Sequence, residues 1–348
     1  MALGQTLKVA AAITGLVGLL GVVLAGSLWS DYREFIAAPA SSSHEERVVD
    51  IPRGAGPKTV TSVLVDQGVV TDSRLFVLYL REMKAAPKLR AGEYRFWTDQ
   101  SPAEVLDVLI SGVEVGYSVT LPPGLRIEEM ASRVAASGRG SAERYIELAY
   151  SADFIASADL GIEPQPANLE GLLMPNTYSF RKDAGSDDVV AAQLKAFKAV
   201  WDDRRLARAL ELGLSPYEVV TLASVVEKET GVASERPLIG GVFHNRLRKG
   251  MRLESDPTII YGLKNYDGNI RKSDIRRPHP WNTYVIPALP PTPIAGPGVE
   301  AIDGVLWPTT TKALFFVAMG DGTHHFSETY AEHSRAVDRY QRRRRRSQ

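Results

Sequence analysis

Apolar residues fill an unbroken stretch near the start of the chain, VAAAITGLVGLLGVVLAGSLWS at 9–30, which contains no charged side chain. An α-helix of about 20 apolar residues spans a bilayer, so this stretch predicts a transmembrane anchor. A cleaved signal peptide is the alternative, because small residues at 24–27 offer a cleavage site, although the apolar core of such a peptide is shorter. Lys8 and the free amine favour a cytoplasmic N-terminus, residues 1–8, and place the rest of the chain outside the cytoplasm.

The next segment, 31–45, contains the run AAPASSSHE without periodicity and predicts a linker. After it, one pattern occurs three times: a short apolar strand, a Pro/Gly turn and a short amphipathic helix. The three strands are VVDIPRGAG, GEYRFWT and YSVTLPPGL, with their turns. Ser101 and Glu104 form a capping box ahead of the second helix. Residues 46–118 are therefore predicted to form a small α+β module, and 119–167 a bridging segment.

A second domain is predicted over residues 168–340. Ser215 and Glu218 form another capping box there. From Pro257 on, the chain is rich in Pro and Gly (RRPHPWNTYVIPALPPTPIAGPG), which predicts extended or turn backbone rather than helix. Long ordered loops of this kind commonly build binding clefts. The regular elements expected are helices at 187–201, 215–230, 235–249 and 330–339 and a strand, ALFFVAM, at 313–319.

Charge and cysteine content narrow the function classes. The 41 Lys and Arg residues balance 41 Asp and Glu residues, so no net field argues for nucleic acid as a partner. The sequence has no cysteine, which excludes disulfides and thiolate metal sites and fits either an oxidising or a reducing compartment. The tail at 341–348 contains the run Arg342–Arg346, for which a solvated segment is favoured over one that binds phosphate or anionic lipid.

The helix predicted at 215–230 ends in the stretch SVVEKETG, which holds Glu227 and Glu229 just before Gly231. Glu229 lies in the last turn, where unsatisfied carbonyl groups make the helix end partly negative. That position, together with burial, is expected to raise the pKa of Glu229, as a general acid at neutral pH requires. The pattern alone also allows an alternative, in which both glutamates are solvated and neither takes part in catalysis.

Four blocks carry a resemblance to a known family. They are LEGLLMPNTYSF at 169–180, ASVVEKETGVASERPLIGGVFHNRLRKGMRLESDPTIIYG at 223–262, NTYVIPALPPTPIAGPG at 282–298 and HHFSETYAEHSRAV at 324–337. Their order, with one N-terminal anchor and a LysM-like module ahead of a catalytic domain, resembles the endolytic murein transglycosylases, the YceG-like or MltG family. Asn176 departs from the Pro-Asp-Thr-Tyr of that family, so a carboxylate role is not available at this position.

The resemblance implies an α+β protein with an N-terminal transmembrane helix, a small LysM-like α+β module and a mixed α/β catalytic domain with a lytic-transglycosylase-like cleft. The family cleaves MurNAc-GlcNAc bonds within peptidoglycan glycan strands and forms 1,6-anhydro-MurNAc ends without consuming water. The resemblance thus implies a lyase that terminates nascent strands. It also implies a place in the cell inner membrane, with the catalytic domain in the periplasm, and peptidoglycan synthases (penicillin-binding proteins) as further partners.

One acid–base residue suffices for that chemistry. Lytic transglycosylases of other families carry their acid in a Glu-Ser pair at a helix end, which Glu229 and the following Thr resemble and Glu227 and the following Lys do not. Glu229 is therefore expected to be catalytic, and Glu227 to be structural. The alternatives are a non-catalytic peptidoglycan-binding scaffold protein and a hydrolytic muramidase that pairs Glu229 with Glu170 or Asp256.

Further candidates lie in the same blocks. Neither His324 nor His325 comes with an H-E-x-x-H motif or a cysteine pair, so no metal and no cofactor is expected, and one of the two is expected to be a polar wall of the cleft. Glu170 could instead stabilise a turn. Arg252, Asp256 and Tyr261, which lie in the central block, could instead shape the cleft. Substrate-binding roles are expected for Glu170, Arg252, Asp256, Tyr261, Asn282, Tyr284 and His325.

Overall fold

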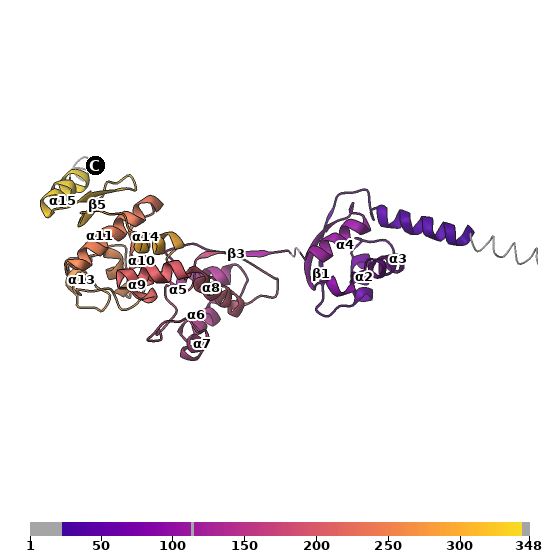
Figure 1. Cartoon of the computed structure of the whole chain (residues 1–348), viewed down its shortest axis with the longest axis horizontal. Helices are drawn as coiled ribbons and strands as arrows, with labels where there is room; N and C mark the ends of the chain where they lie inside the picture. The colour runs from indigo at the N-terminus through magenta and orange to yellow at the C-terminus, as the bar shows by residue number, and fades with distance from the viewer. Residues whose placement is uncertain (1–22, 113–114, 343–348) are drawn as a thin grey trace, which may run out of the picture. The chain divides into compact units, whose positions relative to one another are not determined.

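The computed structural model describes residues 23–112 and 115–342 (Figure 1). The chain divides into two compact units, Met1–Tyr117 and Ser118–Gln348. Each unit has a hydrophobic core of its own. Both combine helices with small two-stranded sheets, which confirms the mixed α+β class expected from the sequence.

The smaller unit is built on an antiparallel pair of strands in which Ile51 lies opposite Gly92. The capping box predicted for Ser101 and Glu104 is present at the start of its last helix. The chain order is strand, two helices, strand, helix: β1 (Glu46–Ile51), α2 (Pro57–Asp66), α3 (Ser73–Glu82), the short 3₁₀ helix η1 (Ala86–Lys88), β2 (Gly92–Trp97) and α4 (Pro102–Ser111).

Helix α3 was not predicted from the sequence. Its N-cap, Asp72, accepts hydrogen bonds from the backbone N–H groups of Arg74 and Leu75, and it buries Phe76 and Leu80 in the core of the smaller unit. Capping and burial together explain why a segment with charged residues near both ends is helical.

The predicted membrane anchor lies mostly outside the described residues. Residues 23–37 are helical, while positions 9–22 of the uncharged run are not described. The predicted linker therefore begins as helix over 31–37, because Tyr32 and Phe35 pack into the core of the smaller unit. Within 23–112 and 115–342, no single helix is long and apolar enough to cross a membrane. The pair α9 (Asp203–Leu212) and α10 (Pro216–Glu229) meets the criteria of length and composition together, with a bend of 85°. Because α10 is buried in the core of the larger unit, we interpret it as a core helix.

In the larger unit, β3 (Tyr117–Leu121) pairs with β4 (Asn176–Phe180). Residues 119–167, predicted as a bridging segment, supply helices whose apolar sides belong to the same core as α10. The helices of this unit, besides α9 and α10, are α5 (Ile127–Ala136), α6 (Ala142–Tyr150), α7 (Ala152–Ser157), α8 (Ser186–Val200), η2 (Ala233–Glu235), α11 (Arg236–Arg248), α12 (Asp256–Gly262), α13 (Lys272–Arg276), α14 (Val299–Leu306), α15 (Tyr330–Val337) and the π-helix η3 (Asp338–Arg342).

Helix α10 lies at the centre of this unit, in contact with α9, α11 and α14 (Figure 1). Ser215 and Glu218 form the predicted capping box at its start. All residues from Val219 to Val226 are buried, because nearly every side of the helix is apolar or small. The last turn is where the helix leaves the core, and this places Glu227 and Glu229 at the edge of tightly packed structure.

The Pro/Gly-rich part of the chain is only partly irregular. Residues 277–298 contain neither helix nor strand, as predicted. The prediction was wrong for the flanking segments, which form α12, α13 and α14. Helix α12 starts with Asp256-Pro257, and a proline in the first turn is compatible with a helix because its missing N–H has no intrahelical partner there. A Cβ at Gly171, whose φ is +77°, would lie 2.3 Å from Pro293, so the irregular segment packs directly on the backbone beside Glu170.

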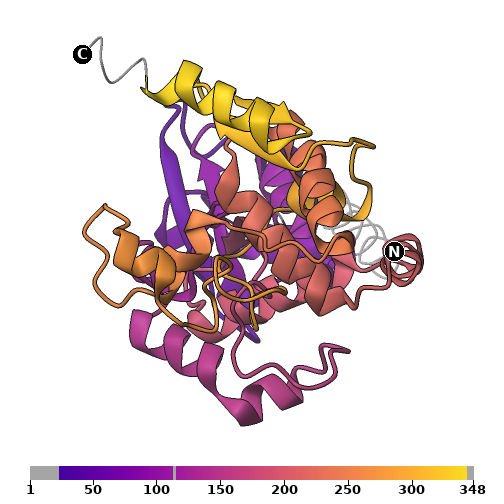
Figure 2. The ribbon, with the colours of Figure 1, turned by 90° about the vertical axis from the view of Figure 1, so that its left-hand side faces the viewer.

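Strands β5 (Phe315–Ala318) and β6 (His324–Ser327) form an antiparallel hairpin in which Phe316 lies opposite Phe326. Asn245 of α11 donates hydrogen bonds to the backbone carbonyl groups of Thr311 and Ala313 and so holds the chain that enters the hairpin. Helix α15 packs on both strands and forms the yellow edge of the larger unit in Figure 2. These contacts bring the C-terminal part of the chain to the end of α10.

Candidate active site

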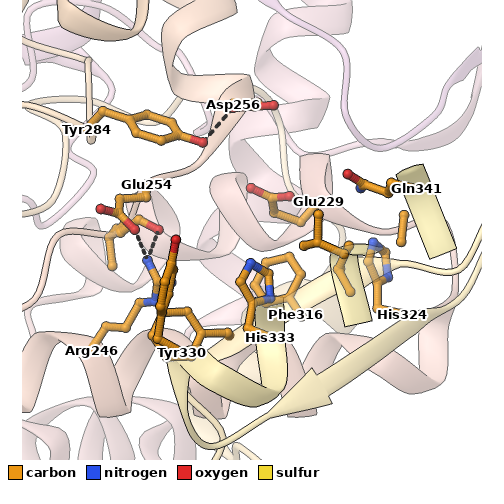
Figure 3. Close-up of a pocket in the computed structure, with 15 residues that line it drawn as sticks. Glu229, Arg246, Glu254, Asp256, Tyr284, Phe316, His324, Tyr330, His333 and Gln341 are labelled. Atoms are coloured by element: carbon orange, nitrogen blue, oxygen red, sulfur yellow. Dashed lines mark hydrogen bonds and ion pairs between the residues drawn. The ribbon is translucent and has the colours of Figure 1, made fainter. Parts of the chain in front are cut away.

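A cavity of about 420 Å³ lies beside the C-terminal end of α10 (Figure 3). Its walls come from α10, α11, the segment that leads from α11 into α12, the irregular segment 277–298, the β5–β6 hairpin, α15 and η3. A cavity that combines apolar walls with a few converging polar groups is typical of a binding or catalytic site. The polar lining residues are Glu229, Arg246, Glu254, Asp256, Tyr284, His324, Tyr330, His333 and Gln341, and the apolar ones are Leu253, Phe315, Phe316, Val317, Ala318 and Val337.

Glu229 is the last residue of α10 and lines this cavity. Ser255 Oγ donates a hydrogen bond to its Oε1 (2.5 Å). Burial raises the pKa of Glu229 to about 7; the hydrogen bond from Ser255 opposes this shift, the negative charge of Asp256 adds to it, and the positive charge of Arg246 opposes it. A carboxyl group with a pKa raised this far can keep its proton near neutral pH, which suits a general acid.

The turn before α12 determines the direction of the Ser255 hydroxyl. Ser255 is the N-cap residue of α12, yet its side chain makes no capping hydrogen bond, since the hydroxyl donates to Glu229. Its backbone N–H donates to Thr283 Oγ1 (2.9 Å). The preceding residue, Glu254, has a φ of +52°, a left-handed conformation that costs about 1–2 kcal/mol for a residue with a Cβ. Such strain commonly occurs at functional sites.

Two polar pairs lie on the wall next to Glu229 (Figure 3). Tyr284 Oη donates a hydrogen bond to Asp256 Oδ1 (2.7 Å), and burial raises the pKa of Tyr284 above its ordinary value, so its hydroxyl stays protonated at neutral pH. Arg246 Nη1 donates to Glu254 Oε2 (3.1 Å). The structure thus brings two of the predicted substrate-binding residues, Asp256 and Tyr284, to the same cavity as Glu229.

Glu227 lies outside this cavity. Its Oε1 accepts a hydrogen bond from Arg236 Nη2 (2.8 Å), and its Oε2 accepts one from the backbone N–H of Gly298 (3.0 Å). The Glu227 side chain exposes only 6% of its surface. Because Arg236 begins α11 and Gly298 precedes α14, this carboxylate joins three helices, which is the kind of contact that a structural role requires.

Glu170 is buried in another part of the larger unit. Tyr261 Oη lies 3.3 Å from its Oε2 as a hydrogen-bond donor, and the Arg126 guanidinium stands 4.8 Å from the centre of the Tyr261 ring. Burial raises the pKa of Glu170 to about 8, and the negative charge of Glu128 adds to the shift. Neither Glu170 nor Tyr261 lines the cavity at Glu229.

Arg252 and Asn282 also lie outside the cavity. Arg252 is exposed, and its Nη1 donates to the backbone carbonyl of Tyr284 (3.1 Å). Asn282 is buried, and its side-chain amide donates to backbone carbonyl groups of the segment around α13, including those of Asp274 and Arg277. The Asn282 amide therefore holds the loop together and has no donor left for a sugar.

The structure places the two neighbouring histidines on opposite sides of β6. His325 is exposed, with its ring 5.7 Å from that of Tyr340, and does not line the cavity. His324 lines the cavity. Adjacent residues of a strand face opposite sides, so only one of the pair can form the wall. The register of the strand decides which one, and local sequence does not encode that register.

Sequence analysis did not single out Ser255, Glu254 or His333, and it left open which of His324 and His325 lines the cavity. Ser255-Asp256-Pro257 has the pattern of a helix start, which could have placed Ser255 at a turn, but not against a residue 26 positions away. His333 Nδ1 is buried and has no hydrogen-bond partner within the described part of the chain. Among the described residues, no group of three or more His, Cys, Asp or Glu side chains is placed to hold a metal ion.

Comparisons with known proteins point in one direction. Residues 49–339 match the YceG-like family. An endolytic murein transglycosylase of Bacillus subtilis (strain 168) is 27% identical over 323 residues, which covers 89% of each chain. An endolytic murein transglycosylase of Streptococcus pneumoniae (strain D39) is 27% identical over 85% of this chain, which spans only 59% of that relative. A crystal structure of a YceG-like protein from Listeria monocytogenes gives a TM-score of 0.59 at 26% identity and covers 84% of this chain and 98% of that one.

Proposed function

The chain belongs to the YceG-like family, as its sequence blocks indicated, and we propose that it is an endolytic lytic transglycosylase, a lyase that cleaves MurNAc-GlcNAc bonds within peptidoglycan strands. The observation that carries the proposal is the carboxyl group of Glu229, which has a pKa of about 7 and lines a cavity large enough for part of a glycan strand. The names of the relatives from Bacillus subtilis and Streptococcus pneumoniae support the same activity.

In the proposed mechanism Glu229 acts first as an acid and then as a base. Its carboxyl group gives a proton to the glycosidic oxygen while the bond from that oxygen to C1 of the muramyl sugar breaks, and the bonding electrons stay with the oxygen. The Glu229 carboxylate then takes the proton of the muramyl 6-hydroxyl as that oxygen bonds to C1. Glu229 regains its proton, an anhydro ring forms and no water is consumed. Ser255 holds Oε1, which leaves Oε2 for the proton transfers.

A hydrolytic muramidase is the second candidate, because Asp256 lines the same cavity as Glu229. In that mechanism Asp256 would activate a water molecule or attack C1. Asp256 accepts a hydrogen bond from Tyr284, which favours a role in shaping the wall. The pairing of Glu229 with Glu170 has less support, since Glu170 does not line the cavity.

The experiment that tests this function uses the purified full chain and isolated sacculi. Mass spectrometry should find muropeptides with 1,6-anhydro-MurNAc ends, released by the wild-type chain and not by Glu229→Gln. A scaffold protein would bind sacculi and release nothing, and a muramidase would release reducing ends. Either result would contradict the proposal.

We further propose that residues 9–30 anchor the protein in the cell inner membrane, with 1–8 in the cytoplasm and residues 31–348 in the periplasm. Protease added to spheroplasts should then digest all but a small fragment. The strand–helix–helix–strand order of β1, α2, α3 and β2 supports a LysM-like glycan-binding role for residues 46–118. The proposed catalytic domain at 168–340 shares its core with residues 119–167, and a basic tail follows at 341–348.

That glycan-binding role has its own test. Deletion of residues 46–118 should weaken binding to sacculi and leave some cleavage, and unchanged binding would refute the role. A protein in this position would terminate nascent strands beside peptidoglycan synthases. Co-purification of the full chain with penicillin-binding proteins from membranes would test that partnership.

A further inference from the structure

One imidazole of the cavity wall is held by a carboxylate that the proposed mechanism does not use. His324 Nδ1 lies 2.7 Å from Glu235 Oε2, and the backbone N–H of His324 donates to Glu235 Oε1 (2.8 Å). Thr230 Oγ1, next to Glu229 in the chain, donates to Glu235 Oε2 (3.0 Å). The His324 and Glu235 side chains each expose only 12% of their surface. Glu235 therefore fixes His324 relative to the end of α10.

Glu235 also selects the tautomer of His324. Burial raises the pKa of Glu235, but the hydrogen bonds from His324 and Thr230 outweigh it and bring the pKa below its ordinary value. An ionised carboxylate can only accept hydrogen bonds, so Nδ1 of His324 carries a proton and donates. In the neutral imidazole, Nε2 is then an acceptor.

The acceptor at Nε2 is available to a ligand. His324 lines the cavity, and none of the described residues makes a hydrogen bond to its Nε2. The Phe316 ring meets the imidazole edge-on, with ring centres 5.5 Å apart and planes at 90°, which fixes the plane of the imidazole. In Figure 3, Glu229 lies between Tyr284 and His324. Other acceptors of the wall, Glu254 and Asp256, already receive hydrogen bonds from protein groups.

We propose that His324 is a substrate-binding residue whose Nε2 accepts a hydrogen bond from a sugar hydroxyl or acetamido N–H group of the glycan strand bound at Glu229. This inference rests on the proposed function. Both donors are plentiful on MurNAc and GlcNAc. Because Glu235 fixes the ring before substrate arrives, little side-chain freedom is lost on binding. His324 transfers no proton in this account; Glu235 acts on the substrate only through it.

Two amide substitutions separate this role from a structural one. His324→Asn places an amide nitrogen where Nδ1 stands, so it keeps the hydrogen bond to Glu235 and loses the acceptor at Nε2. His324→Gln places an amide where Nε2 stands, so it keeps an acceptor for the cavity and loses the contact with Glu235. The matched control is His325→Asn, at the exposed neighbouring position that does not line the cavity.

The assay uses soluble, uncrosslinked glycan strands and the full chain. A lost hydrogen bond of about 1 kcal/mol corresponds to roughly a fivefold change in affinity. His324→Asn should therefore raise KM about fivefold and leave kcat within about twofold, while His324→Gln and His325→Asn should stay closer to wild type. A wild-type KM for His324→Asn, or a larger defect in His324→Gln than in His324→Asn, would overturn the proposal.

A spectroscopic test works even if these variants fold poorly. In the ¹⁵N-histidine-labelled Glu229→Gln chain, at a pH where the imidazole is neutral, Nε2 of His324 should have the chemical shift of an unprotonated nitrogen. It should move when glycan strands that the wild-type chain cleaves are added, whereas His325 should not respond. In Glu235→Gln the side-chain amide has one acceptor oxygen for three donors, which are the backbone N–H of His324, its Nδ1 and the Thr230 hydroxyl. The substitution should therefore shift the proton of the His324 ring toward Nε2.

The outcomes of this test distinguish the two proposals. If the strands bind, as calorimetry would show, and Nε2 of His324 does not respond, the inference about His324 fails and the proposed function stands. If the wild-type chain cleaves no strands at all, the proposed function fails and the inference fails with it.

Discussion

The surroundings of Glu229 and of Glu170 resemble each other in electrostatics and differ in access. Burial raises the pKa of both carboxyl groups, to about 7 for Glu229 and about 8 for Glu170. Glu229 lines a cavity with Asp256 and His324. Glu170 is 1% exposed and lies under Tyr261, away from that cavity.

The difference shows what a raised pKa can and cannot indicate. A shifted pKa reports that a carboxyl group has left water, which happens in tightly packed structure as well as in active sites. A general acid must also reach the substrate. Of these two residues, only Glu229 meets both conditions, and a turn-stabilising role fits Glu170 better than sugar binding does.

The largest expected effect on activity comes from replacing the carboxyl group of Glu229 by an amide, with the same replacement at Glu170 for comparison. Glu229→Gln keeps the shape and loses the transferable proton, so the release of anhydro-muropeptides should fall roughly 10²–10⁴-fold. Glu170→Gln should retain activity within about tenfold, since its site is structural. Circular dichroism must show both variants folded. Loss of activity in Glu170→Gln with near-normal activity in Glu229→Gln would reverse the comparison.

The pH dependence of activity should follow Glu229 and not Glu170. The reaction needs the protonated form of Glu229, whose pKa is about 7, so kcat/KM should be level below that pH and fall about tenfold per pH unit above it. A fall that begins near pH 4.5, or no fall up to pH 9, would mean that Glu229 is not the acid. The measurement is the initial rate on soluble strands across the pH range, with a check that the protein stays folded.

The sequence predicted the local parts of this arrangement and not the long-range ones. The capping box of Ser215 and Glu218 and the raised pKa of Glu229 follow from spacing and helix-end electrostatics. The contact of Ser255 with Glu229 and the choice of His324 over His325 depend on how α12 and the hairpin pack against α10. No local pattern encodes that packing. For the same reason, the family resemblance of its block predicts substrate binding by Asn282 and does not reveal that its amide donates to the loop backbone.

The stability of the protein should decline with rising pH because of both buried carboxyl groups. Below pH 4.5, each is protonated in the folded and unfolded states alike. Above it, the unfolded chain releases protons that the folded chain keeps, so stability is lost up to about pH 7 for Glu229 and about pH 8 for Glu170. The shifts correspond to at most roughly 3 and 5 kcal/mol.

Each Gln variant lacks its own part of this decline. The melting temperature of Glu170→Gln relative to wild type should therefore rise as the pH goes from 4.5 to 8, and that of Glu229→Gln should rise only up to about pH 7. Parallel curves for wild type and both variants would show that these groups are not buried as described.

The smallest effect on activity is expected from Glu227→Gln. The substitution removes the charge that faces Arg236 and keeps one acceptor for the backbone of Gly298. Leaving Arg236 with a neutral partner should lower the free energy of unfolding by about 1–3 kcal/mol, while kcat of the folded protein changes only a few-fold. A folded Glu227→Gln without activity would contradict this account and would assign the catalytic role to Glu227 instead of Glu229.

The central claim is that Glu229 alone cleaves the glycan strand without water, and the isotope content of the new ends tests it most directly. Sacculi are digested by the full chain in H₂¹⁸O, and the new ends are weighed by mass spectrometry. The account predicts 1,6-anhydro-MurNAc ends without ¹⁸O from the wild-type chain and no new ends from Glu229→Gln. Reducing ends that carry ¹⁸O would show that a water molecule attacks C1, and would contradict the claim.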